Sequence, residues 1–318
     1  MTTGLEHVRF AHCALPDLDL DGIDLSMEFL GRQIAAPVLV SSMTGGPEKT
    51  AEINHNIAAA CQALGLPFGV GSQRVALDHG SFAGLGPELR RIAPDVPILG
   101  NLGAAQLRGD AALDKAHRAV EMIGADALYI HLNPLQEAVQ PEGDRDWSGL
   151  FDRIAMLAAK LEVPVAVKEV GFGLSADLCR RLFDVGVTIL DVAGAGGTNW
   201  ARVEAARVSG DRASLGATFA DWGIPTADAI LAAREACPEA VVIGSGGLKS
   251  GLDIARALRL GADLGGIAAG LLKDAMDSQA DLQTRLATVV EEVRITCFCT
   301  GSGDLAALKS AELMPDGH

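Results

Sequence analysis

The stretch that decides the fold is Ala127–Glu137, which reads ALYIHLNPLQE. Its first four residues form an apolar run that is typical of a buried strand. An imidazole, two carboxamides and a carboxylate follow within the next seven residues. Two interpretations are open at this point. The polar groups either cap a helix and bind water in an ordinary loop, or they form an active site at the end of a strand.

Seven further apolar runs share this arrangement, in which each run ends in a glycine-rich or polar turn and precedes an amphipathic segment. They occupy residues 37–40, 67–70, 96–99, 163–167, 187–190, 241–243 and 262–267. Alternating strands and helices predict a parallel sheet. Eight such units over about 240 residues match a (β/α)₈ TIM barrel, for which ~250 residues are typical. An open doubly wound sheet is the alternative, but no G-x-G-x-x-G sequence opens a first helix.

The chain of 318 residues is expected to form a single α/β domain with three parts. Residues 1–37 form an irregular N-terminal extension that packs on the barrel, and residues 38–273 form the barrel itself. Residues 200–235 are an insertion between the sixth and seventh strands. Residues 274–318 form a C-terminal helical tail.

The net charge of the chain limits the kinds of molecule that it is expected to bind. Lys and Arg total 26 against 41 Asp and Glu, so the net charge is 26 − 41 = −15. This charge argues against a nucleic-acid partner, because phosphate backbones select basic surfaces. A small anionic substrate would need a local positive site or a metal, since the overall field repels it.

The cysteines and the N-terminus favour a cytoplasmic protein. The six cysteines include no C-x-x-C pair and are expected to be reduced. No basic segment followed by an apolar run opens the chain, so no signal peptide is expected. No uncharged apolar stretch reaches the ~18 residues that a membrane-spanning helix needs.

In a (β/α)₈ barrel, residues that follow the strands share one rim, where active sites are built. Singly, a Ser or Asn in such a place is usually a turn former or a helix cap. Polar residues after nearly every strand together predict a site. They are Ser41–Thr44, Ser72–Arg74, Asn101, His131–Glu137, Lys168 and Thr198, with small residues at Gly246–Gly247 and Ala268–Ala269.

Three features of this rim suggest its chemistry. The small-residue loops after strands seven and eight lie where barrels bind phosphate through backbone N–H groups, although plain turn geometry would also explain them. Lys168 ends an apolar strand and is expected to face an anion or an electron-rich cofactor, unless it only snorkels to the rim. Glu137 is either a solvated surface group or a ligand to Mg²⁺ beside substrate phosphate oxygens.

Six motifs in this order resemble the type 2 isopentenyl-diphosphate isomerases, which are FMN-dependent (β/α)₈ barrels. The resemblance covers roughly residues 2–305. The motifs are SMTGG at 42–46, HLNPLQE at 131–137, PEGDR at 141–145, VKEVG at 167–171, DVAGAGGT at 191–198 and SGG at 245–247.

The resemblance implies an isomerase that interconverts isopentenyl diphosphate and dimethylallyl diphosphate without net redox change. Its cofactors would be reduced FMN and Mg²⁺, with NADPH as the reductant. The partner would be a small prenyl diphosphate, with no nucleic acid and no membrane involved. A homo-oligomer, either a tetramer or an octamer, would be expected.

The resemblance also implies roles for individual residues. Lys168, at the pyrimidine edge of the flavin, would stabilise the anionic reduced form. Gln136 would position or relay a proton, although a carboxamide is a poor acid or base, and His131 would join these two as a catalytic group. The flavin ring would be lined by Ser42, Met43, Thr44, Ser72, Asn101, Lys168 and Thr198, and its phosphate held by Gly246, Gly247, Leu248, Ala268 and Ala269. Substrate would meet Ser72, Gln73, Arg74, His131 and Gln136, and Glu137 would bind Mg²⁺.

Two departures from the family pattern matter. Family members usually carry an Arg-Lys-x-x-His element before the region that matches Thr2–Glu6, and the sequence given starts after it. We expect either a start site recorded too late or altered diphosphate binding. Ala193 stands where a Ser is usual, which is expected to cost one flavin hydrogen bond. The alternatives are therefore another FMN barrel, such as a 2-hydroxy-acid oxidase, and an impaired flavin- or phosphate-binding barrel.

Overall fold

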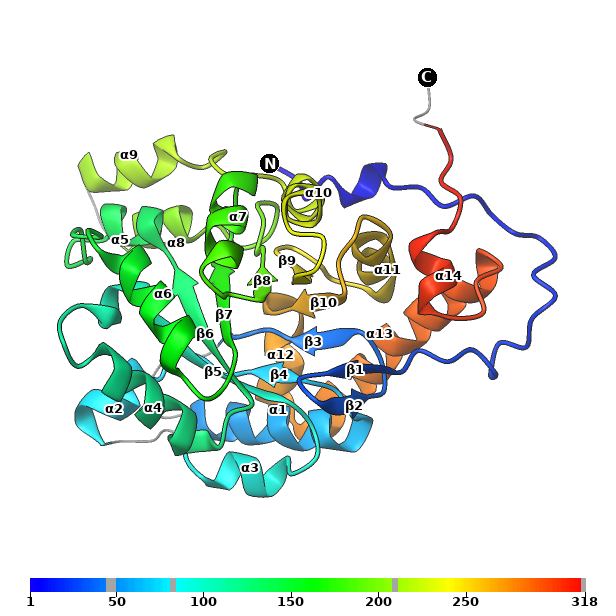
Figure 1. Cartoon of the computed structure of the whole chain (residues 1–318). Helices are drawn as coiled ribbons and strands as arrows, with labels where there is room; N and C mark the ends of the chain where they lie inside the picture. The colour runs from blue at the N-terminus through cyan, green and yellow to red at the C-terminus, as the bar shows by residue number, and fades with distance from the viewer. Residues whose placement is uncertain (44–49, 81–83, 208–210, 316–318) are drawn as a thin grey trace.

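A computed structural model of the chain describes residues 1–43, 50–80, 84–207 and 211–315. Eight parallel strands close into a barrel in the order β10-β3-β4-β5-β6-β7-β8-β9, with helices around it (Figure 1). The predicted (β/α)₈ fold is confirmed. The barrel strands are β3 (Val38–Val40), β4 (Phe68–Gly69), β5 (Ile98–Gly103), β6 (Ala127–Leu132), β7 (Val165–Glu169), β8 (Ile189–Asp191), β9 (Val241–Ser245) and β10 (Leu264–Ile267).

Helices follow the strands as the alternating pattern predicted. The helices before residue 170 are η1 (Leu5–His7), α1 (Thr50–Leu64), α2 (Arg74–His79), α3 (Glu88–Ile92), η2 (Ala104–Leu107), α4 (Ala112–Ile123), α5 (Pro134–Val139) and α6 (Leu150–Lys160). Those after it are α7 (Ala176–Asp184), α8 (Trp200–Ala206), α9 (Asp211–Thr218), α10 (Thr226–Ala236), α11 (Gly251–Arg259), α12 (Ala269–Asp277), α13 (Gln279–Cys299) and α14 (Leu305–Lys309). Residues 200–235 therefore contain α8, α9 and most of α10.

The barrel interior is a small apolar cluster that a hairpin closes from one end. Strand-interior residues such as Leu99, Tyr129 and Ile243 form the cluster with Phe29 and Ile34. The last two belong to an antiparallel hairpin of β1 (Met27–Phe29) and β2 (Arg32–Ile34), which lies across the barrel from α5 and α8 (Figure 1). The expectation that residues 1–37 are irregular was wrong for this segment.

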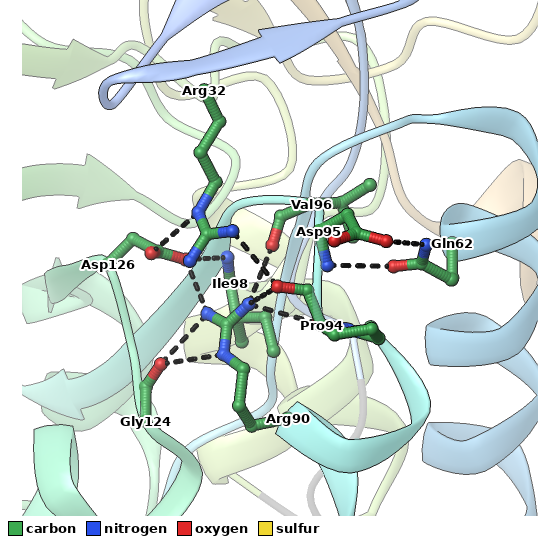
Figure 2. A network of polar contacts seen from close by, with 10 residues as sticks. Arg32, Gln62, Arg90, Pro94, Asp95, Val96, Ile98, Gly124 and Asp126 are labelled. Carbon is green, nitrogen blue, oxygen red and sulfur yellow. Dashed lines mark hydrogen bonds and ion pairs between the residues drawn. The ribbon is translucent and has the colours of Figure 1, made fainter.

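A polar network ties the hairpin to the barrel. Figure 2 shows Arg32 of β2 donating from Nε to Asp126 at 3.0 Å, beside Arg90 of α3, which donates to the other oxygen at 2.5 Å. Arg90 also donates to the carbonyls of Val96 and Gly124, at 2.9 and 2.8 Å. One guanidinium thereby donates to backbone carbonyls in the loops before both β5 and β6, since the planar guanidinium group carries several N–H donors that point in different directions.

The same network recurs four strands further around the barrel. Arg234 of α10 donates to Asp263 at 2.6 Å and to the carbonyls of Ala240 and Gly261, at 3.0 and 2.8 Å. Lys309 of α14 takes the place that Arg32 has in the first network, with Nζ 2.7 Å from Asp263. The sequence Gly-Ala-Asp precedes both β6 and β10. The two halves of the barrel thus repeat one Arg–Asp connection, which the sequence analysis did not identify.

The C-terminal tail packs on the barrel and pairs with the N-terminal segment. Helix α13 runs to Cys299, whose carbonyl accepts from the Cys13 backbone at 2.8 Å. All six cysteines are free, as predicted. Within the described ranges, no helix combines the length and the apolar character that crossing a membrane would require.

Candidate active site

The polar residues predicted from the sequence gather at the carboxyl end of the barrel, because all eight strands run in parallel. Asn101, His131 and Lys168 lie within their strands, near the carboxyl ends. Ser42, Met43, Ser72, Thr198, Gly246, Gly247, Leu248, Ala268 and Ala269 lie in the segments after the strands or at the start of the next helix. Thr44 lies outside the described residues.

A chain of hydrogen bonds fixes His131. Its Nδ1 lies 2.8 Å from Oδ1 of Asn101, whose Nδ2 donates to the carbonyl of Val70 at 3.0 Å. With the Asn101 oxygen as the acceptor, the imidazole carries its proton on Nδ1 and presents Nε2 as an acceptor. Gln73 supports this chain from behind, since it is fully buried, accepts from the Asn101 backbone at 2.8 Å and donates to the carbonyl of Ala119. The structure therefore does not bring the Gln73 side chain to the rim.

The surroundings of His131 favour its neutral form. Burial, together with the nearby charges of Lys168 and Arg74, lowers the pKa of His131 to about 3. In the free protein, His131 is thus a hydrogen-bonding group and not a cation. Arg74, exposed at the start of α2, has no ion pair within the part of the chain that the structure describes.

We expect His131 to make stability depend on pH between about 6.5 and 3. The unfolded chain takes up this proton near pH 6.5 and the folded protein only near 3, so stability falls as the pH falls through this window. Lowering the pH from 7 to 5 should reduce the free energy of unfolding by about 1–2 kcal/mol more in the wild type than in His131→Gln, allowing for water around a half-buried ring. Urea unfolding at both pH values measures this. Equal losses in the two proteins would contradict the assignment.

Gln136 projects from α5 toward a carboxylate on a distant helix. Its Nε2 donates to Oε1 of Glu204 on α8 at 2.9 Å, and its Oε1 accepts from Nδ2 of Asn133 at 3.2 Å. Glu204 is buried, at 3% exposure, with Arg207 at 3.7 Å from its other oxygen. The carboxamide predicted from the sequence is therefore directly joined to a carboxylate.

Glu137 is held by the loop that follows α5. Its Oε1 accepts from Nδ2 of Asn133 at 2.8 Å, and its Oε2 accepts from the backbone N–H of Asp144 at 2.8 Å. A Cβ on Gly143 would lie 2.0 Å from the Glu137 carbonyl oxygen, so the loop approaches this closely only with glycine there. The motif Pro141–Arg145 is thus a clamp that orients the Glu137 carboxylate.

The donor set around Glu137 suits a hard cation that keeps part of its water shell. Oδ1 of Asn133 is buried and lacks a partner among the described residues. One carboxylate and one carboxamide oxygen are oxygen ligands that Mg²⁺ accepts beside water and phosphate. No group of three or more His, Cys, Asp or Glu side chains in the described ranges forms a cage for a metal, so substrate oxygens would have to complete the coordination.

Lys168 is a buried cation within the barrel. It is 8% exposed, and its Nζ donates to the carbonyl of Glu169 at 2.6 Å. Burial lowers the pKa of Lys168, while the charges of Asp191 and Glu169 oppose this. The Glu169 carboxylate accepts from three backbone N–H groups, those of Val170, Gly171 and Phe172. Its pKa is nevertheless raised by burial to about 7.

The rim also carries polar atoms that a ligand would satisfy. The hydroxyl oxygens of Ser41 and Ser42 are buried and have no partner in the described part of the chain. They follow β3, next to β10 in the barrel, where the predicted phosphate loops Gly246–Leu248 and Ala268–Ala269 also lie. Unpaired buried hydroxyls are costly, so their presence fits a polar cofactor such as FMN.

Sequence reasoning missed Glu204 and gave no individual role to three other residues just described, Asp191, Asn133 and Ser41. Glu204 was overlooked because it lies in the insertion, 68 residues from Gln136. Asp191 and Asn133 were noted only as motif letters, and Ser41 only as a rim residue. The spacing of α8 behind the DVAGAGGT motif was the only available signal for Glu204, and it does not specify a contact.

Comparisons with known proteins place the chain among relatives that it matches over nearly its whole length. Residues 112–315 match the family model of FMN-dependent dehydrogenases. An isopentenyl-diphosphate delta-isomerase of Xanthobacter autotrophicus is 57% identical over 98% of this chain and 91% of its own length. One from Stutzerimonas stutzeri is 54% identical over 98% and 90%.

Solved structures show the same fold at low identity. The lactate oxidase of Pediococcus acidilactici shares 15% identity with a TM-score of 0.73, over 99% of this chain and 85% of that one. At this identity the likeness concerns the barrel alone. The curated relatives, by contrast, match at high identity over nearly the whole chain, and the chain belongs to the isopentenyl-diphosphate delta-isomerase family, in the FMN-dependent form that its motifs predicted.

Proposed function

We propose that the protein interconverts isopentenyl diphosphate and dimethylallyl diphosphate with bound reduced FMN, with Mg²⁺ at Glu137 and with NADPH as the reductant. The observation that carries the proposal is the Gln136–Glu204 hydrogen bond of 2.9 Å beside the clamped Glu137 carboxylate. The hydrogen bond joins the Glu204 carboxylate, which can hold a proton, to the Gln136 carboxamide, which can position that carboxylate. Both lie next to the candidate diphosphate site at Glu137.

The reaction needs a proton delivered to one carbon of the alkene and another removed from its allylic neighbour. A carboxylate accepts and returns a proton far better than a carboxamide does. Glu204 would therefore hold the proton, and Gln136 would orient the carboxylate and the substrate. Because Glu204 is almost fully buried, bulk water has little access to this proton.

Reduced FMN, when bound, would supply the electron-rich ring that faces the alkene. The residues that fit it are the unpaired hydroxyls of Ser41 and Ser42, the Lys168 ammonium and the small-residue loop Gly246–Leu248. Lys168 would stabilise negative charge on the reduced ring. Asn101 would hold His131 in a single neutral tautomer at the edge of the site.

Diphosphate binding in a protein of net charge −15 requires local cations. Mg²⁺ would supply two positive charges at Glu137, with Oδ1 of Asn133 as a further oxygen. Arg74 would add a third charge, and neutral His131 would offer its Nε2 as a hydrogen-bond acceptor. We further propose that the protein is a cytoplasmic homo-oligomer. The six free cysteines support the cytoplasmic location, and the homo-oligomer rests on the family resemblance.

An anaerobic assay with isopentenyl diphosphate, FMN, NADPH and Mg²⁺ tests the proposed function, with dimethylallyl diphosphate detected by NMR. Turnover that requires both FMN and Mg²⁺ is the expected result. Failure to bind FMN would refute the proposal. Flavin reduction by 2-hydroxy acids would instead indicate an oxidase. Turnover only in a protein extended upstream by an Arg-Lys-x-x-His element would implicate the recorded start site.

A further inference from the structure

Asp191 is a fully buried carboxylate inside the barrel to which the proposed reaction gives no task. It ends β8 and is paired in register with Lys168 of β7. Ile189 and Ala166, two residues earlier on the same strands, belong to the apolar cluster of the barrel interior. Because side chains alternate along a strand, Asp191 and Lys168 both point into the barrel, one layer nearer the rim.

Two neutral hydroxyls satisfy the Asp191 oxygens. The Tyr129 hydroxyl donates to Oδ2 at 3.0 Å, and the Ser245 hydroxyl donates to Oδ1. Neither donor carries a charge, so the negative charge of Asp191 stays available to its surroundings. Among the described residues, no ion pair within 4.0 Å includes Asp191 or Lys168, yet each charge favours the ionised form of the other.

The other titratable groups around Lys168 are less suited than Asp191 to act as its negative counter-charge. His131, its register neighbour on β6, is held in its neutral form. The Glu169 carboxylate is occupied by three backbone N–H groups and contributes less than Asp191 does to the charge of Lys168. Arg74 is a cation and would repel the ammonium.

We propose that Asp191 is a positioning residue that acts through Lys168, as the counter-charge that holds the lysine in its cationic form inside the barrel. This rests on the proposed function, in which the Lys168 ammonium stabilises the anionic reduced flavin. Burial raises the pKa of Asp191, and the Lys168 charge and the hydroxyls of Ser245 and Tyr129 oppose this rise, since hydrogen bonds to a charged form favour that form. Lys168 would then be charged before FMN is reduced.

Asp191→Asn separates this role from a structural one. Asn keeps the shape and can still accept from Tyr129, so the tie between β6 and β8 remains, but the charge is lost. The readout is the pH at which bound reduced FMN loses its N1 proton, followed by absorbance under anaerobic conditions. If Lys168 loses its proton without Asp191, the flavin anion loses its cation and this pH rises. If Lys168 stays charged, removal of a nearby negative charge lowers it.

We expect Asp191→Asn to raise this pH by about one unit or more, a tenfold change in the ionisation equilibrium. Lys168→Met should raise it similarly, and the double variant should show no further rise above Lys168→Met, because Asp191 raises it only through the lysine. Tyr129→Phe, which removes one donor and keeps the ring, should shift the pH in the same direction by less. Tyr129→Phe provides the test if the Asp191→Asn variant does not fold.

Asp126→Asn is the matched control. It removes a carboxylate from the Arg32–Arg90 network. The substitution should lower the stability of the protein but leave unchanged the pH at which bound reduced FMN loses its N1 proton. An unchanged or lowered pH in Asp191→Asn, or a further rise when Asp191→Asn is added to Lys168→Met, would overturn the inference. A wild type that neither binds FMN nor isomerises the substrate would instead refute the proposed function, so the two failures are distinguishable.

Discussion

Replacing Glu137 by Gln should lower kcat with isopentenyl diphosphate by at least about 100-fold and remove the response of the rate to Mg²⁺. The variant keeps the length of the side chain and can still accept from the Asp144 backbone N–H, which now meets Oε2 at 2.8 Å. It loses the charge that would hold the cation. Loss of a residue that only supports a metal ligand costs about 10- to 100-fold, so loss of the ligand itself should cost more. The measurement is the initial rate across a Mg²⁺ titration at saturating FMN.

Glu142→Gln provides the matched control for this experiment. Glu142 is exposed in the same loop and undergoes the same change of charge. If Glu137 acts as a ligand and not through the general field of an acidic protein, the Glu142 variant should retain wild-type rates within about twofold, since exposed charges interact weakly. Wild-type Mg²⁺ dependence in Glu137→Gln would remove the metal assignment.

The barrel was predictable because its signal is repeated. Each strand is an apolar run followed by a turn, and the eight runs need only parallel pairing to close. The hairpin Met27–Ile34 was missed because its two strands have three residues each and its turn carries unusual residues. Leu30, with φ 53°, precedes Gly31 there, whereas Asn or Asp is the usual sign of such a turn.

The site was predictable for residues within strands, because the strand determines which way each side chain points. It was less predictable for residues in loops and helices. Asn101, His131 and Lys168 lie in strands, so period-2 alternation brings them together at one end of the barrel. Gln73 lies in a loop, where sequence gives no direction, and it faces the backbone of α4. Contacts between distant segments, such as that of Gln136 with Glu204, depend on how a helix packs and leave no local pattern.

That distant contact gives the second large expected effect. Glu204→Gln should lower kcat by about 100-fold or more, because loss of a general acid–base typically costs 10²- to 10⁴-fold. The substitution keeps an oxygen that Gln136 can donate to, so substrate placement should survive and KM should change little. Steady-state kinetics under anaerobic conditions separate kcat from KM, and FMN absorbance confirms that the flavin is still bound.

Arg207→Met distinguishes the carboxylate itself from the charges around it. Arg207 is largely exposed, at 68% of its side chain, and lies 3.7 Å from the Glu204 oxygen that does not bind Gln136. An exposed partner contributes little, so this variant should keep kcat within about twofold. If Glu204→Gln also keeps kcat, the proton must be held elsewhere. A fall in kcat with unchanged KM in that variant alone would assign the proton to the buried carboxylate that Gln136 orients.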